Sequence, residues 1–292
     1  MFLQEVKQQS HTVEQMCHSY IEAMEIIKDS IIAFTQEQTL QGKTYDSAKA
    51  YFKETYIPLA DGIILLSEAV KRAHQQLPEQ YIAEVDSNDL ESDVLQAHLE
   101  RIESFILSMD SLHEANPLLY LHSESIASSF RETQMKIQEK LNRLITFDTS
   151  SVGIFAAIDQ LANDVQAGLM QVHSGKAWSA SSKTFSVSNL NMSWAKNIHK
   201  LQLHTEMEEM FQQEVELNEH NKAALLSMAQ AHPDVEVPTR LISYIQENEN
   251  HPLLQAEPEE VQTVLHEAKT GDIHLSYFME SIFKNEGTDA IT

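Results

Sequence analysis

Apolar side chains recur every seven residues along the first part of this chain, and this period constrains the fold more than any other feature. One stripe consists of Val6, Val13, Tyr20, Ile27 and Phe34. A second set interleaves with it and consists of Leu3, Cys17, Met24 and Ile31. A sustained heptad predicts a helix of roughly 37 residues, about 55 Å long. Such a helix is not stable alone, so another helix must pack along its length.

A second apolar pattern supplies that helix. Its members are Phe52, Tyr56, Leu59, Ile63, Leu66, Val70, Ala73 and Leu77. We predict an antiparallel hairpin in which the stripe from Val6 to Phe34 packs against Phe52, Leu59, Ile63 and Leu66. Pro58 is expected to kink the second helix near Thr55, because proline lacks a backbone donor. Leu77-Pro78 and the polar stretch 84–93 are expected to mark a break or a turn.

Leu40, Gln41 and Gly42 lie between these two patterns. Gly42 is one of only seven glycines in 292 residues, and glycine adopts positive φ at no steric cost. We therefore expect Gly42 to close the first helix with a left-handed cap. Leu40 can then pack back against the hairpin.

The residues around this turn carry a family resemblance. Residues 39–52 read TLQGKTYDSAKAYF, and Tyr56-Ile57-Pro58-Leu59 follows. This pattern closely resembles the LXG domain of polymorphic toxins that Gram-positive bacteria export by type VII (ESX-like) secretion. Such domains begin with a long helix, turn at Leu-x-Gly and continue with a Tyr-rich second helix interrupted by an Ile-Pro-Leu-like step. The resemblance is strongest over residues 1 to about 112 and fades by about residue 200.

The resemblance implies a function in export rather than in catalysis. Family members are expected to bind small α-helical WXG-like partner proteins, and the type VII secretion ATPase is expected to recognise the assembly. Toxicity in this family belongs to a variable C-terminal domain, which we expect to be absent from this chain. The protein would be cytoplasmic before export and then secreted without a signal peptide. The candidate partner-interface residues are Val6, Val13, Tyr20, Ile27, Phe34, Tyr51, Phe52, Tyr56 and Leu59.

A second export feature is weaker. Tyr120 and Glu124 fit the YxxxE/D signal of small helical type VII substrates. The chain has eight tyrosines and 44 acidic residues, so one such match is expected by chance. The motif therefore carries little weight.

The remainder of the chain also reads as helical, since glycine and proline are rare. Helical patterns are expected near 94–109, 118–147, 154–172, 194–228, 238–248 and 259–283, with Thr149-Ser150-Ser151 as the cap of the third. The serine-rich stretch 174–191 is expected to form a loop or a short β-ribbon. We predict an all-α fold: an elongated bundle of long antiparallel helices with a smaller C-terminal helical region. Residues 1–200 would form the LXG-like targeting and partner-binding domain, and 201–292 an acidic helical linker or pre-toxin region.

Charge argues against several classes of ligand. The formal net charge is −24, which opposes binding of nucleic acid or anionic lipid by electrostatics. Residues 205–292 hold 18 acidic and four basic residues, a pattern expected for solubility, with docking to a basic partner as the alternative. Neither a signal peptide nor a stretch of about 20 apolar residues is found, so no membrane insertion is expected. Cys17 is the only cysteine and is expected to be buried.

No catalytic, cofactor-binding or metal-binding constellation stands out, so we expect no enzyme activity and no cofactor. HExxH, CxxC, GxGxxG, P-loop and GxSxG patterns are absent. His199 and His204 fall on different faces of a helix, while Glu216 and His220 share a face and are expected to form a solvated pair. Trp178 and Trp194 are expected to anchor a core or a hairpin.

Two alternatives stay open at this point. The heptads also permit a self-associating helical scaffold, in which the Leu-Gln-Gly context is coincidence. An enzymatic or pore-forming toxin activity could instead reside in residues 205–292, although that region is acidic and polar.

Overall fold

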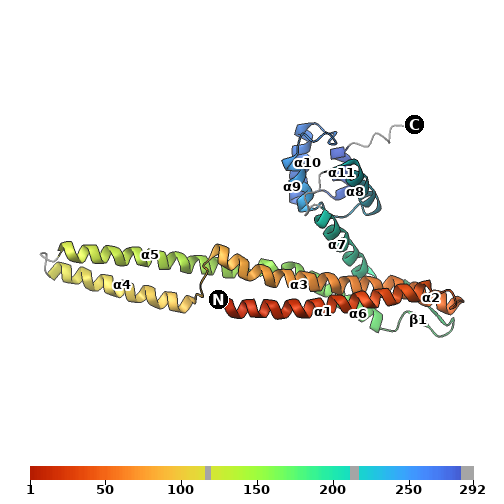
Figure 1. The fold of residues 1–292 in the computed structure, drawn as a ribbon, viewed down its shortest axis with the longest axis horizontal. Helices are drawn as coiled ribbons and strands as arrows, with labels where there is room; N and C mark the ends of the chain where they lie inside the picture. Colours follow the sequence, from red (N-terminus) through yellow and green to blue (C-terminus); the bar gives the residue numbers. More distant parts are fainter. Residues whose placement is uncertain (116–119, 211–216, 284–292) are drawn as a thin grey trace. The chain divides into compact units, whose positions relative to one another are not determined.

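A computed structural model describes residues 1–115, 120–210 and 217–283 (Figure 1). The all-α prediction is confirmed, because helices account for nearly all regular structure in these ranges and strands form only one short ribbon. The chain divides into two compact units, Met1–Met170 and Gln171–Thr292. The boundary expected from the sequence lay later, between residues 200 and 201.

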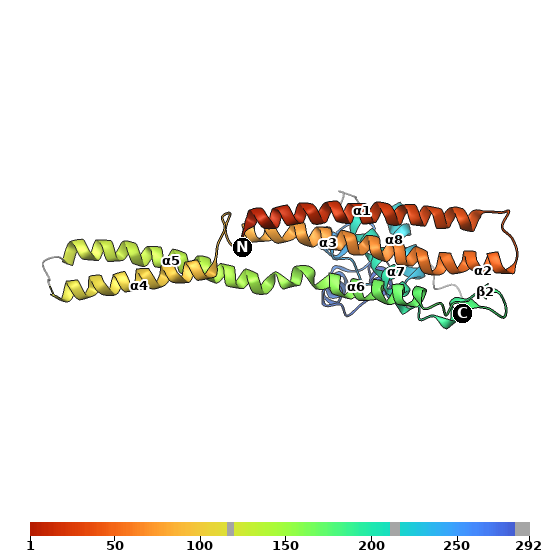
Figure 2. The same cartoon turned by 90° about the horizontal axis from the view of Figure 1, so that it is seen from below.

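The first unit begins with the predicted helical hairpin. Helix α1 (Leu3–Gln36) lies antiparallel to a second long helical run, which comprises α2 (Lys43–Tyr51), the π-helical turn η1 (Phe52–Tyr56) and α3 (Ile57–Glu84) (Figure 2). The apolar side chains between α1 and α3 account for this pairing, since neither helix could be stable alone.

The line of α1 that faces α3 differs from the prediction. The buried residues are Leu3, Ser10, Cys17 and Ile31, which recur at multiples of seven. Val6, Val13 and Phe34 of the predicted stripe are only half-buried, and Tyr20 and Ile27 are 52% and 40% exposed. The stripe therefore does not pack as a whole against the second helical run, although Phe34 contacts Phe52 as predicted, with ring centroids 5.7 Å apart. Helix α1 carries two neighbouring apolar lines, and one helix can cover only one of them.

The backbone accommodates the two prolines of the second helical run in different ways. Pro58 stands in the first turn of α3, and the backbone before it widens into the π-turn η1 instead of breaking. Pro78 lies inside α3, so the break expected at Leu77-Pro78 was wrong, while the turn predicted after residue 84 is confirmed.

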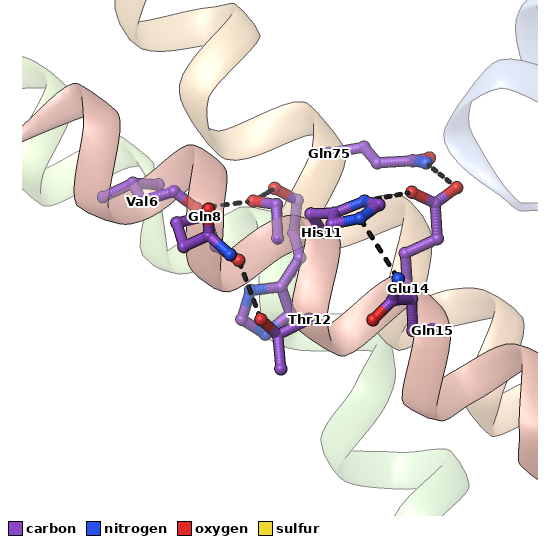
Figure 3. Close-up of polar contacts among 9 residues, drawn as sticks. Val6, Gln8, His11, Thr12, Glu14, Gln15 and Gln75 are labelled. Atoms are coloured by element: carbon purple, nitrogen blue, oxygen red, sulfur yellow. Dashed lines mark hydrogen bonds and ion pairs between the residues drawn. The ribbon is translucent and has the colours of Figure 1, made fainter.

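Pro78 leaves the carbonyl of His74 without its usual helical donor. The Ser10 hydroxyl of α1 lies 2.6 Å from that carbonyl oxygen and 2.9 Å from the carbonyl oxygen of Val6. Close by, the Gln75 side-chain amide donates to the Glu14 carboxylate over 3.1 Å (Figure 3). Polar contacts from α1 thus support α3 where its own hydrogen-bond ladder is interrupted.

The described remainder of the first unit consists of α4 (Ser92–Ala115), α5 (Tyr120–Ser150) and most of α6 (Val152–His173), whose last three residues fall in the second unit. Helices α4 and α5 pack as a second antiparallel pair around Leu95, Leu99 and Leu141. The predicted cap before α6 is reduced to one residue, Ser151, whose hydroxyl donates back to the Asp148 carbonyl rather than accepting from α6.

The second unit starts with the ribbon predicted in the serine-rich stretch. Strands β1 (Trp178–Ser179) and β2 (Thr184–Phe185) pair antiparallel, and the 3₁₀ turn η3 (Val187–Asn189) follows. The ring of Trp178 lies tilted against that of Phe185 with centroids 4.8 Å apart, whereas Trp194 is fully buried.

The described part of this unit continues with α7 (Ser193–Met210), α8 (Glu219–Ala231), α9 (Thr239–Glu247), α10 (Pro258–Thr270) and α11 (Leu275–Phe283). They enclose a core that includes Leu225, Leu241, Ile245, Val261, Phe278 and Phe283. The single helix expected over 259–283 is two helices, because Gly271 adopts a left-handed conformation with φ 76° and ends α10. The described part of this region is thus a packed helical unit.

Candidate partner-docking site

The Leu-Gln-Gly turn joins the two helices of the hairpin. Helix α1 ends at Gln36, before the tripeptide, and Gly42 precedes the first residue of α2. Gly42 has the expected positive φ (106°), but its ψ of 162° is not that of a left-handed helix cap. The predicted role in closing α1 was therefore wrong: Gly42 starts the second helix.

The connection between the helices is ordered by Glu37. Its carboxylate accepts hydrogen bonds from the Thr39 amide (2.8 Å) and the Thr39 hydroxyl (2.7 Å), and these bonds lower the pKa of Glu37. The Lys49 ammonium of α2 donates to the Glu37 carbonyl. Thus α1 stops at Gln36, and side chains on both sides of Gly42 hold the connection.

An aromatic cluster follows at the π-turn. The Phe52 ring lies 4.7 Å from the Tyr56 ring and 5.7 Å from the Phe34 ring of α1, measured between centroids. Tyr51 contacts both Phe52 and Tyr56, but it is buried, as is Leu59. Tyr51 and Leu59 therefore serve the interior of this chain and are not available to a partner.

An open groove lies on the α1 side of this cluster. It is lined by Ile27, Ser30, Ile31, Phe34, Phe52 and Tyr56. None of these residues is charged, and the Ser30 hydroxyl donates to the Ile26 carbonyl of its own helix over 2.8 Å. We name this feature the aromatic groove. It offers predominantly apolar surface.

The groove continues into a face of α1 that carries no charged residue. This charge-free face consists of Gln9, Thr12, Val13, Met16, Ser19, Tyr20, Ala23, Ile26, Ile27, Ser30, Ala33 and Phe34. Val13 and Phe34 are half-buried, and the other members are exposed. Within it, Val13, Met16, Tyr20, Ala23, Ile27, Ser30 and Phe34 follow the alternating three-and-four spacing of a coiled-coil seam. Glu22 and Asp29 border the face on the side away from α3.

An ion pair fixes α1 against α3 near the groove. The Lys28 ammonium lies 2.8 Å from the Asp61 carboxylate, and both side chains are largely buried. Burial alone would lower the pKa of Lys28, but the carboxylates of Asp61 and Glu25 outweigh it and raise the pKa. The hairpin is therefore held from its interior, which leaves the charge-free face uncommitted.

The other residues singled out in the sequence do not form a site. Tyr120 begins α5, but its side chain lies outside the described part of the structure, and Glu124 accepts from Arg131 over 3.1 Å. Glu216 also lies outside the described residues, as does the side chain of His220. His204 pairs at 4.0 Å with Glu208, and no group of three potential metal ligands occurs in the ranges that the structure describes.

Cys17 is buried as expected, and burial raises the pKa of its thiol. None of the described helices is both long and apolar enough to cross a bilayer.

Two features were missed at the level of sequence. Ser10 completes the buried line of α1, but a serine is polar, so the search for apolar heptad positions passed over it. Its proximity to Pro78 could not be predicted either, because the two residues are far apart in the sequence. Met16, Ala23 and Ile26 belong to the charge-free face, which a search for uncharged helical faces would have found, since charged residues make up 22% of the chain.

Comparison with known proteins agrees with this arrangement. Residues 3–185 match the family described as "LXG domain of WXG superfamily". A Bacillus cereus protein named "Toxin" is 36% identical over 202 residues, which cover 69% of this chain and 36% of that protein. The chain therefore spans about a third of the length of that relative. Because the family match covers more than half of the sequence and includes the whole hairpin, the chain belongs to the LXG domain family of the WXG superfamily.

Proposed function

We propose that this chain is the targeting and partner-docking part of an antibacterial toxin that leaves the cell by type VII secretion. Small helical partner proteins dock on the hairpin, and the secretion ATPase recognises the assembly. The chain itself performs no catalytic step in this proposal.

The charge-free face of α1 is the observation that carries the proposal. It spans residues 9–34, roughly 38 Å of helix at about 1.5 Å per residue, and it presents large apolar side chains such as Met16, Tyr20 and Ile26 to solvent. Its coiled-coil spacing suits a second amphipathic helix, and its small residues Ser19, Ala23 and Ala33 permit close approach. Family membership and the toxin relative support the same function.

A binding experiment with a matched control tests this proposal. The full chain is co-expressed with each small helical protein encoded beside its gene, and complexes are purified through a tag on the chain. Tyr20→Asp places a charge in the middle of the proposed interface, where burial without a partner is costly. Tyr277→Asp is the control, because Tyr277 is equally exposed (54% against 52%) but lies on α11.

We expect the unmodified chain and Tyr277→Asp to retain a helical partner, and Tyr20→Asp to lose it. The unmodified chain and Tyr277→Asp should also be exported into the culture medium, whereas Tyr20→Asp should not. Export should stop in a strain without the secretion ATPase. Retention of the partner by Tyr20→Asp at the level of the control would contradict docking on this face.

A further inference from the structure

The aromatic groove is an open apolar depression in the surface of the hairpin. It has a volume of about 420 Å³ and lies at the end of the charge-free face nearest the turn. Ile27, Ile31 and Phe34 supply its wall from α1, and Phe52 and Tyr56 supply its wall from the π-turn. With no charged group in the lining, an apolar side chain is the matching occupant.

Pro58 explains why the second wall stands where it does. In a regular α-helix the amide of residue 58 would donate to the carbonyl of Glu54, and a proline ring at 58 would clash with that carbonyl. Here the Ile57 amide bonds to the carbonyl of Phe52, five residues back, so the turn is wider than an α-turn. The wide turn absorbs the missing donor without a break.

The wide turn also aligns side chains. Residues four apart drift by about 40° per step around a regular α-helix, yet Tyr51, Thr55 and Leu59 are all buried. The Thr55 hydroxyl, fully buried, donates to the Tyr51 carbonyl over 2.6 Å and fastens the turn. Phe52 and Tyr56, each one residue after a buried position, are consequently kept in line along the groove, next to Phe34.

We infer that the aromatic groove is a socket for one bulky apolar side chain of the partner helix, and that the Pro58 turn opens this socket. The inference rests on the proposed function and specifies how the partner is selected. The partner helix carries one large aliphatic or aromatic residue at the position that reaches Phe52, and it carries lysine or arginine beside its apolar seam.

Charge complementarity selects a separate basic-flanked helix over a second copy of this chain. The charge-free face is bordered by Glu22 and Asp29, and the whole chain has a net charge of −24. Two copies meeting through this face would bring like charges together, which opposes association, whereas basic residues on a partner would be attracted.

Filling the socket is the first test. Ser30→Trp places an indole in the groove from an exposed position of α1, so the fold has no reason to fail. Ser108→Trp is the matched control, because Ser108 is also exposed in mid-helix and, like Ser30, donates to the carbonyl four residues back. The ligand is the small helical protein that co-purifies with the unmodified chain. In titration calorimetry, Ser30→Trp should bind it at least tenfold more weakly, and Ser108→Trp should bind it as tightly as the unmodified chain.

The second test concerns the turn. Pro58→Ala returns the backbone donor, so the helix can close as a regular α-helix and move Phe52 away from its place beside Phe34. Pro78→Ala makes the same exchange further along the same helix, where no groove residue is affected. Pro58→Ala should weaken partner binding several-fold with unchanged helicity by circular dichroism, and Pro78→Ala should leave binding unchanged.

The outcomes separate the socket from the docking face. If Ser30→Trp binds as tightly as the unmodified chain while Tyr20→Asp does not bind, the socket is overturned and the docking face stands. If the unmodified chain binds none of the helical proteins, the proposed function fails and the socket fails with it. If the unmodified chain self-associates in light scattering and Ser30→Trp abolishes this, the occupant is a second copy and the inference is overturned. If Pro58→Ala binds the partner normally, the inference that the turn before Pro58 opens the socket is overturned.

Discussion

At Gly42 the backbone adopts φ 106° and ψ 162°, a combination that is essentially confined to glycine. The positive φ followed from the sequence, because a glycine between two apolar helical patterns is commonly a turn residue. The position of Gly42 at the start of α2 could not be predicted from the sequence. Contacts of Glu37 with Thr39 and Lys49 end α1 before the tripeptide. Side-chain contacts of this kind do not show in the periodicity of apolar residues along the sequence.

Substitution of Gly42 tests the backbone account. A Cβ at this position would meet no atom within 4 Å, so any cost arises from backbone strain alone. We expect Gly42→Ala to lower the free energy of unfolding by about 1–3 kcal/mol in urea titrations. Gly153 in α6 is the control, since a Cβ there also meets nothing and its φ is not positive. Gly153→Ala should be neutral or stabilising, and an equal loss at both glycines would contradict this account.

Ser10 and Pro78 form a pair whose energies should be coupled. Ser10→Ala leaves the His74 carbonyl without a donor, which we expect to cost about 1–3 kcal/mol of unfolding free energy. In a Pro78→Ala background the amide of residue 78 can donate to that carbonyl, so Ser10→Ala should cost less. A double-mutant cycle measured by thermal and urea unfolding gives the coupling. Strict additivity of the two changes would show that the hydroxyl does not support α3.

At the scale of the elements, sequence predicted which segments are helical better than which sides of them are buried. The heptads correctly indicated α1 and α3, and the polar stretch after residue 84 correctly indicated a turn. The two apolar lines of α1 could not be ranked, because the choice depends on which one α3 covers. The two prolines look alike in sequence, yet Pro58 widens the helix and Pro78 is accommodated inside it by Ser10. Of the candidate interface, Tyr20, Ile27, Phe34, Phe52 and Tyr56 lie where a partner could reach them, and Tyr51 and Leu59 do not.

The contact between α5 and the turn after α3 should depend on pH. The Lys140 ammonium lies 2.6 Å from the Asp86 carboxylate, and this bond, with a further bond from Asn88, lowers the pKa of Asp86 from 3.8 to about 2. Because the folded pKa is depressed, the stabilisation is complete above pH 4 to 5 and is lost as the pH falls towards 2. Lys140 is half-exposed, so water screens the pair, and we expect Lys140→Met to remove about 1 kcal/mol at pH 7.

Two measurements check the contact between Asp86 and Lys140. Lys140→Met should return the pKa of Asp86 towards its usual value in an NMR titration of the carboxyl group. Lys136→Met is the control, because Lys136 and its partner Glu132 are both mostly exposed, and it should change stability less. An unchanged Asp86 titration after Lys140→Met would exclude the proposed cause of the shift.

At the scale of the whole molecule, the chain combines a helical hairpin unit with a second unit that has its own core. The core of the second unit lies within residues 203–283 and includes fully buried side chains such as Leu241, Ile245 and Phe278. The sequence left open whether this acidic region is a linker or a pre-toxin region, because composition does not report packing. Helices α8 to α11 are short, and each contributes apolar residues to the shared core.

We expect the fragment 171–292 to fold without the first unit. Its circular dichroism should be helical, and its thermal transition should be cooperative and should match one component of unfolding of the full chain. Added salt should raise the midpoint, because residues 205–292 carry 18 acidic against four basic residues and repel one another. A fragment that melts without a cooperative transition would show that the second unit depends on the first.

Hydrogen exchange of the full chain, measured with and without its small helical partner, tests most directly whether a partner helix docks along α1. Amides of 9–36 and of 49–57 should exchange more slowly in the complex, because the charge-free face and the aromatic groove become covered. Peptides from 92–115 and 219–283 should exchange at the same rate in both states. Slower exchange confined to 92–150 or to 219–283, with 9–36 unchanged, would contradict docking on α1.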